Sequence, residues 1–247
     1  MSLADLDYPE VHFARTGLKT VVCRVMFNPI LKIGQEPPAD FQELVRGAFP
    51  QLFKEESAEF RIAPGASVEA LPAGPAVWRF RSEDEAWTAG LAINFLSLET
   101  TAYRDFVDFQ SRFSILEQAL QSVYQIAQYV RVGLRYINIF APDDFPGGWQ
   151  RKFNPHLLGP MADPVLRGEL RESRQAFVLA QGDWTITVQH GTDNNGYRLD
   201  IDHAAEGHVH AADLAERLRD FNRRTYQVFR WALSEELRAE MEAKADE

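Results

Sequence analysis

The sequence of 247 residues contains a single cysteine, Cys23, and has no long hydrophobic run. One cysteine excludes an intrachain disulfide and a paired-cysteine metal site. Cys23 lies in the apolar run 21–27, which indicates a buried thiol rather than a nucleophile. No stretch approaches the roughly 18 apolar residues of a membrane span, and the acidic start Met1–Asp7 lacks the apolar segment of a signal peptide. We therefore expect a cytoplasmic protein.

Basic residues are also scarce, with 26 Lys and Arg against 36 Asp and Glu and a net charge of −10. This acidic balance argues against binding to nucleic acid or to an anionic membrane surface. The chain also lacks the glycine-rich phosphate loops, the Gly-x-Ser-x-Gly turn and the His-Glu-x-x-His helix of common enzyme classes. The sequence therefore leaves the cofactor unknown and leaves open whether the protein is an enzyme.

The remaining composition, 45% hydrophobic and 25% charged, is typical of a globular protein with a substantial core. In the first half, alternating apolar residues predict strands at 18–27, 58–62, 76–81 and 87–96. A short helix is predicted at 41–49, after Asp40 as its cap. A long helix from about Thr101 to Gln128 is indicated by an apolar stripe with spacings of three and four residues: Phe106, Phe109, Phe113, Leu116, Leu120, Val123 and Ala127.

The second half repeats this order. Strands are predicted at 131–140, 175–181, 184–190 and 197–202, with a loop and a short helical piece over 142–173. Gly182-Asp183 and the segment 193–196 are hairpin turn signals. A long final helix is predicted from Ala211 to Ala243, with an apolar stripe of Leu214, Leu218, Phe221, Thr225, Val228 and Ala232.

This repetition predicts an α+β protein that is internally duplicated, with halves at 1–129 and 130–247. Each half would consist of a strand, a helix, three strands and a second helix, forming antiparallel sheets with the two long helices on one face. We expect the halves to form one compact unit. A cleft at their pseudo-twofold junction is the expected site for a ligand or partner.

Three pieces of sequence carry a family resemblance: the strand 132–138, Phe41-Gln42 with Phe49-Pro50, and the strand 199–202. They resemble a sporadically distributed prokaryotic family of uncharacterised proteins. The likeness covers most of the chain, but its motifs are strand cores, so it implies no activity and no site residues. The duplicated order also resembles, more loosely, the paired modules of GyrI-like and SOUL haem-binding proteins, which is an analogy of fold alone.

Half of the six histidines fall close together, at His203, His208 and His210, just after Asp200 and Asp202. Asp-x-Asp and His-x-His on extended chain each place both side chains on one face. Such oxygen and nitrogen ligands are suited to a divalent metal. The alternative is that the aspartates form the outward side of a strand and that the histidines are polar residues before a helix.

Arg135 lies in the middle of a predicted strand, and Arg24 occupies a similar place in the first strand. An arginine within a sheet needs a partner or a polar cavity, because an unpaired buried charge is costly. Asp200 and Asp202 are the expected partners in a structural ion pair. The alternative is that Arg135 binds an anionic ligand in a cleft through its bidentate fork.

Two aromatic residues, Phe145 and Trp149, lie in a loop rich in Pro and Gly. They could anchor a ligand or partner, or fold back to seal an edge of the core. The last helix carries a second apolar stripe, which favours deep burial or a dimer: Tyr226, Phe229, Leu233 and Leu237.

Together, these features predict a non-enzymatic protein that binds a small molecule or a protein partner through Arg135, Phe145, Trp149, Asp200 and Asp202. The alternative is a metal-dependent hydrolase or oxygenase that uses the Asp/His cluster at 200–210.

Overall fold

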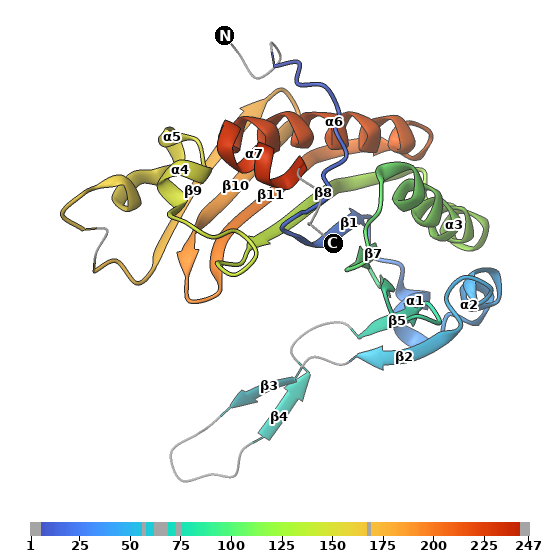
Figure 1. The fold of residues 1–247 in the computed structure, drawn as a ribbon. Helices are drawn as coiled ribbons and strands as arrows, with labels where there is room; N and C mark the ends of the chain where they lie inside the picture. The colour runs from blue at the N-terminus through green and yellow to red at the C-terminus, as the bar shows by residue number, and fades with distance from the viewer. Residues whose placement is uncertain (1–5, 56–57, 62–68, 73–75, 167–168, 243–247) are drawn as a thin grey trace. The chain divides into compact units, whose positions relative to one another are not determined.

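The computed structural model describes residues 6–55, 58–61, 69–72, 76–166 and 169–242 (Figure 1). It confirms an α+β protein with helices and a large antiparallel sheet. Three predicted segments have an end outside the described residues. These ends are Met1 of the acidic start, Ile62 of the strand predicted at 58–62, and Ala243 of the predicted final helix. No helix within the described ranges is both long and apolar enough to cross a membrane. The internal duplication stays a prediction.

The chain divides into two compact units, and each is described by itself. Unit 1 comprises Met1–Val21, Leu134–Ala205 and Ala215–Glu247, and unit 2 comprises Val22–Gly133 and Glu206–Leu214. Three strands have residues in both units: β1 (Leu18–Met26), β8 (Gln128–Phe140) and β11 (Gly196–His210).

In unit 2, antiparallel strands follow the order β2 (Gln51–Glu55), β5 (Val77–Arg81), β6 (Trp87–Ala92) and β7 (Phe95–Thr100). Strands β3 (Ala58–Arg61) and β4 (Glu69–Pro72) pair only with each other among the described residues. Two short helices, α1 (Leu31–Gln35) and α2 (Ala39–Val45), lie between β1 and β2.

The single strand predicted at 87–96 was wrong, because the chain turns back at Ile93-Asn94. Ala92 pairs directly with Phe95, so β6 and β7 form a hairpin. Its turn contains neither Gly nor Pro, and the apolar alternation continues through it. The turn is held from outside the hairpin, because the carbonyls of Ile93 and Asn94 accept backbone hydrogen bonds from Ile30 and Phe27.

Helix α3 (Phe106–Tyr124) is shorter than predicted at both ends. Asp105 caps its start by accepting a hydrogen bond from the Asp108 N–H. Gln125, with a φ of 53°, ends the helix in the left-handed conformation. Ala127 is therefore an exposed residue outside the helix, whereas the middle of the predicted stripe is buried: Phe109, Phe113, Leu116 and Leu120.

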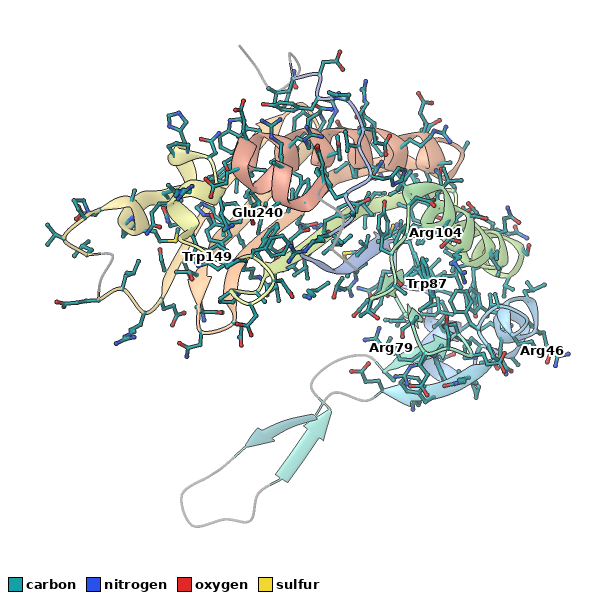
Figure 2. The ribbon with its side chains drawn as sticks, in the orientation of Figure 1. Arg46, Arg79, Trp87, Arg104, Trp149 and Glu240 are labelled. Atoms are coloured by element: carbon teal, nitrogen blue, oxygen red, sulfur yellow. The ribbon has the colours of Figure 1, made fainter. Side chains whose placement is uncertain are left out.

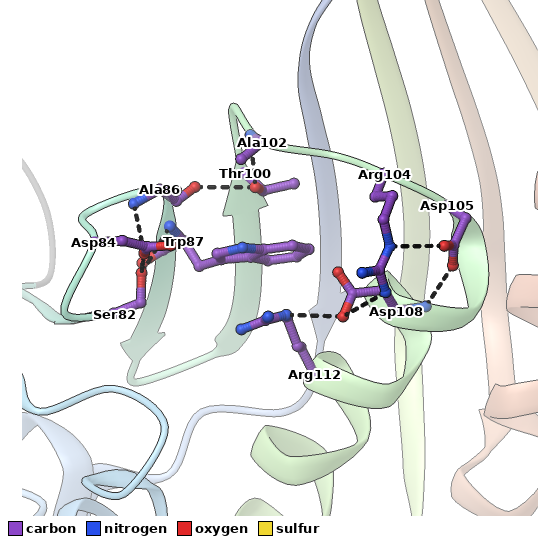
Figure 3. A network of polar contacts seen from close by, with 10 residues as sticks. All are labelled: Ser82, Asp84, Ala86, Trp87, Thr100, Ala102, Arg104, Asp105, Asp108 and Arg112. Atoms are coloured by element: carbon purple, nitrogen blue, oxygen red, sulfur yellow. Dashed lines mark hydrogen bonds and ion pairs between the residues drawn. The ribbon is translucent and has the colours of Figure 1, made fainter. Parts of the chain in front are cut away.

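The first turns of α3 also contact the strands of unit 2 (Figure 3). Trp87 is buried, and its ring centroid lies 5.9 Å from that of Phe109. The guanidinium carbon of Arg112 lies 4.5 Å from the Trp87 ring centroid. Arg112 Nε also donates to Asp108 Oδ1 at 3.2 Å. The arginine thus covers the edge of the core and leaves its charge paired at the surface.

In unit 1, β10 (Trp184–Asp193) pairs antiparallel with both β9 (Ser173–Gln181) and β11. The two predicted hairpin turns are confirmed, because Gln181 pairs with Trp184 and Asp193 pairs with Gly196. The predicted loop after β8 contains α4 (Trp149–Lys152), α5 (Pro155–Leu158) and a 3₁₀ turn at Gly159–Ala162.

The long C-terminal helix is two helices, α6 (Leu214–Ala232) and α7 (Glu235–Glu242), after a 3₁₀ turn at Ala211–Asp213. Every residue of the predicted apolar stripe of α6 is buried. The break follows from partners far away in the sequence: the Asn154 N–H donates to the Ala232 carbonyl, and the Ser234 N–H donates to the Lys152 carbonyl. Ser234 then caps α7 through its hydroxyl.

The N-terminal segment covers the second apolar stripe of the last helices. Tyr226 Oη donates to the Pro9 carbonyl at 2.9 Å, and the Phe13 ring packs edge-on against Phe229. Leu233 and Leu237 are buried within unit 1. The stripe therefore reflects deep burial, and the inference of a dimer from it has no support.

The ion pair between Lys152 of α4 and Glu240 of α7, of which Figure 2 labels Glu240, gives a test of how these two helices pack. Lys152 is fully buried, and its Nζ lies 2.5 Å from both carboxylate oxygens of Glu240. Glu240→Ala leaves this buried ammonium without its carboxylate partner. We therefore expect the free energy of unfolding, measured by urea denaturation, to fall by about 3 kcal/mol.

Glu236→Ala is the matched control, because Glu236 lies on α7 like Glu240 but pairs with Arg151 of α4, which is exposed. It should cost less than about 1 kcal/mol. Equal effects of the two substitutions would contradict a structural role for the buried pair.

Candidate functional site

Helices cover one face of the sheet in unit 1. Tyr136 Oη donates to Asn222 Oδ1 of α6 at 2.7 Å, and the His203 ring stacks on Phe221 of α6 at 3.9 Å. Because side chains alternate along a strand, Arg135 and Asp200 lie on the opposite face. We call this the open face of unit 1; it also carries Ala176, Val178, Thr187, Gln189, Arg198 and Asp202.

Asp200 is the centre of the open face. Arg135 donates to it through two parallel hydrogen bonds of 2.7 Å, from Nε to Oδ1 and from Nη2 to Oδ2. Arg198 adds a third, from Nη2 to Oδ2 at 2.6 Å. The expected ion pair of Arg135 is therefore present, with Asp200 as its partner.

The three groups differ strongly in exposure. The Asp200 side chain is 1% exposed, whereas those of Arg135 and Arg198 are 38% and 44% exposed. The buried carboxylate thus fixes two guanidinium groups that still face solvent. Within the described residues each arginine has N–H groups that are not used on Asp200.

The protonation of Asp200 follows from these contacts. Burial acts to raise its pKa, but the hydrogen bonds and charges of Arg135 and Arg198 outweigh burial, so the pKa lies below its usual value. The pKa of Arg135 is raised, first by its hydrogen bonds to Asp200 and also by the charge of Asp202. Asp200 is therefore an ionised anchor at neutral pH and not a proton donor.

The loop aromatics do not reach this face. Phe145 is buried, with its ring 5.2 Å from that of Phe140. Trp149 begins α4 and packs near Phe153 and Tyr197. Phe145 therefore seals an edge of the core and does not anchor a ligand, because its ring is buried.

The structure does not gather the histidines into one cluster. His203 is buried beneath α6 in unit 1, whereas His208 and His210 are exposed residues of unit 2. In the part of the chain that the structure describes, no three His, Cys, Asp or Glu side chains are arranged to hold a metal ion. An odd spacing of five residues puts His203 and His208 on opposite faces of a regular strand, and Asp200 is occupied by its arginines.

Cys23 is buried, and burial raises the pKa of its thiol, as expected for a core residue. Sequence reasoning missed Arg198. Its signal was the Arg-x-Asp spacing of Arg198 and Asp200, which places both side chains on one face of β11.

No model of a known protein family matches this chain, and no curated protein matches it.

The Asp200 cluster generates a prediction about stability. Arg135→Ala should lower the free energy of unfolding by about 2 kcal/mol, because Arg198 continues to pair with Asp200 and Arg135 is partly screened by solvent. The double variant Arg135→Ala/Arg198→Ala should lower the free energy of unfolding by about 3–5 kcal/mol, because it leaves the buried Asp200 carboxylate without either arginine. Chemical denaturation measures both.

Adding Asp200→Asn to the double variant should recover part of that loss, because the stranded charge is then removed. If Arg135→Ala is neutral and the double variant costs no more, the cluster is not a structural anchor.

A second prediction concerns pH. Burial lowers the pKa of His203 to about 4, so the unfolded chain takes up a proton near pH 6.5 and the folded protein does not. The free energy of unfolding should therefore fall as the pH drops from about 6.5 to about 4, by up to roughly 3 kcal/mol. His203→Phe, which can keep the ring stack on Phe221, should show a smaller fall.

The comparison isolates His203, because His190, whose pKa is also lowered by burial, is present in both proteins. Measurements at pH 8 supply the packing difference alone. Parallel stability curves for the two proteins from pH 8 to pH 4 would contradict the assignment.

Proposed function

We propose that this protein is a non-enzymatic binding protein that recognises the carboxylate group of a small molecule on the open face of unit 1. The observation that carries the proposal is the pair of partly exposed guanidinium groups of Arg135 and Arg198, both held by the buried Asp200. Their positions are determined before any ligand arrives, which lowers the entropic cost of binding.

The charges on this face favour a carboxylate over a polyanion. Two arginines are accompanied by Asp200 and Asp202, so the formal charge of the four groups is zero. Guanidinium N–H groups that remain beside Asp200 can donate to one further carboxylate. A strongly charged anion would be opposed by the two aspartates.

The pKa of the central carboxylate of this face, Asp200, supports binding rather than catalysis. Asp200 pairs with two arginines, and its pKa lies below the usual value. A carboxyl group that acts as a general acid at neutral pH needs a raised pKa instead. The metal-dependent alternative gains no support from the described residues, as argued above.

A thermal-shift screen of small carboxylic acids, followed by calorimetric titration of the compounds that stabilise the protein, tests the proposal. Arg198→Gln should weaken the binding of such a compound by about tenfold or more, because it removes one guanidinium and leaves Asp200 paired with Arg135. Its melting temperature should stay close to that of the wild type.

Arg223→Gln is the matched control, because Arg223 is an exposed arginine of α6 that is paired with Asp220. It removes the same charge from unit 1 and should leave binding unchanged. The proposal fails if no carboxylate stabilises the wild-type protein, or if Arg198→Gln and Arg223→Gln bind the compound equally well.

A further inference from the structure

Unit 2 has a second arginine-bearing sheet face, built differently from the first. Arg79, Gly90 and Ser97 are direct cross-strand neighbours on β5, β6 and β7. The adjacent row of Phe80, Ala89 and Leu98 is buried, so the first row lies on the opposite face. We call this opposite face the arginine face of unit 2; Gly90 and Ser97 are buried on it, whereas Arg79 is partly exposed.

Arg24 joins this face through an aromatic ring. Its guanidinium carbon lies 3.6 Å from the centroid of the Phe95 ring, and Phe95 is two positions from Ser97 on β7. Within the described residues, no carboxylate lies within ion-pair distance of Arg24. A guanidinium that stacks on a ring by its flat side keeps the N–H groups of its edge for another acceptor.

Two glycines in the middle of strands make room for the neighbouring arginines. A Cβ on Gly90 would come within 2.7 Å of Ser97 Oγ and 2.8 Å of Arg79 Nη1. A Cβ on Gly133 would come within 2.9 Å of Arg131 Nη1. Glycine weakens a strand interior and often marks a place where another group approaches closely. Here the closely approaching groups are arginine side chains lying along the sheet.

Among the described residues, two arginines of this face have a carboxylate partner and Arg24 has none. Arg79 Nε pairs with Glu55 at 2.6 Å, and Arg131 Nε lies 3.9 Å from Glu206. Glu99 is exposed on the same face of β7, two positions beyond Ser97. Burial, and then the charges of Arg131 and Arg79, lower the pKa of Arg24, in agreement with the lack of a carboxylate partner.

We propose that the arginine face of unit 2 binds the phosphoryl group of a small phosphorylated molecule, with Arg24 as its principal contact and Arg131 and Arg79 as neighbouring cations. A phosphoryl group carries up to two negative charges and several acceptor oxygens, which suits a fork-shaped guanidinium among other cations. This site is independent of the carboxylate site proposed for unit 1, because it uses other residues in another unit.

Calorimetric titration of the full-length protein with inorganic phosphate and with pyrophosphate tests this site, with acetate as the monoanion for comparison. We expect pyrophosphate to bind most tightly, acetate not to bind at this face, and affinity to fall with added salt. Arg24→Gln should weaken pyrophosphate binding by about tenfold or more. Arg24→Lys, which keeps the charge but loses the fork and the stacking, should give a smaller loss.

The control variant is Arg46→Gln, which removes an exposed arginine at the end of α2 in unit 2 that pairs with Glu43 and should bind pyrophosphate like the wild type. Gly90→Ala should weaken binding while far-ultraviolet circular dichroism stays unchanged, because its Cβ displaces Arg79 and Ser97. The inference is overturned if the wild type does not bind pyrophosphate at millimolar concentrations, or if Arg24→Gln binds it as the wild type does. It is also overturned if Arg198→Gln, and not Arg24→Gln, abolishes binding, which would assign the anion to unit 1.

Discussion

The carboxylate of Asp200 is the group on which the open face of unit 1 depends. Burying it alone would be costly, because a charge removed from water needs partners to replace its hydration. Arg135 from β8 and Arg198 from β11 itself supply those partners. The two Arg135 bonds tie β8 to β11 through their side chains, and all three bonds together hold both guanidinium groups at the surface. Stability and the preorganised binding surface that we propose therefore have one origin.

The two units answer the same physical requirement in different ways. Arg24 and Arg135 both lie within strands, and each must offset the cost of a charge in a sheet. Arg135 meets it with a carboxylate, whereas Arg24 meets it with the face of the Phe95 ring. An aromatic ring stabilises the cation without neutralising it. This difference leads us to infer a carboxylate ligand for one face and a phosphoryl ligand for the other.

Local patterns in the sequence were enough to predict the α+β class, the β9–β10 and β10–β11 hairpins and the buried stripe of α6. Each depends on residues close together in the chain, such as Gly182 in its turn or the spacing from Leu218 to Phe221. The Arg135–Asp200 pair was also predictable, because a charged residue within a strand demands a partner and the candidates were few.

The remaining features depend on partners distant in the chain. The turn at Ile93-Asn94 is held by Ile30 and Phe27, and the break between α6 and α7 is held by backbone groups near Asn154. Which strands lie side by side decided that Arg79 meets Ser97 across Gly90. The sequence by itself determined the class of fold, its local elements and the need of each strand arginine for a partner. Only the tertiary structure decided where elements end and which side chains meet. Those contacts join segments that are far apart in the chain, and a periodic pattern of residues specifies only local structure.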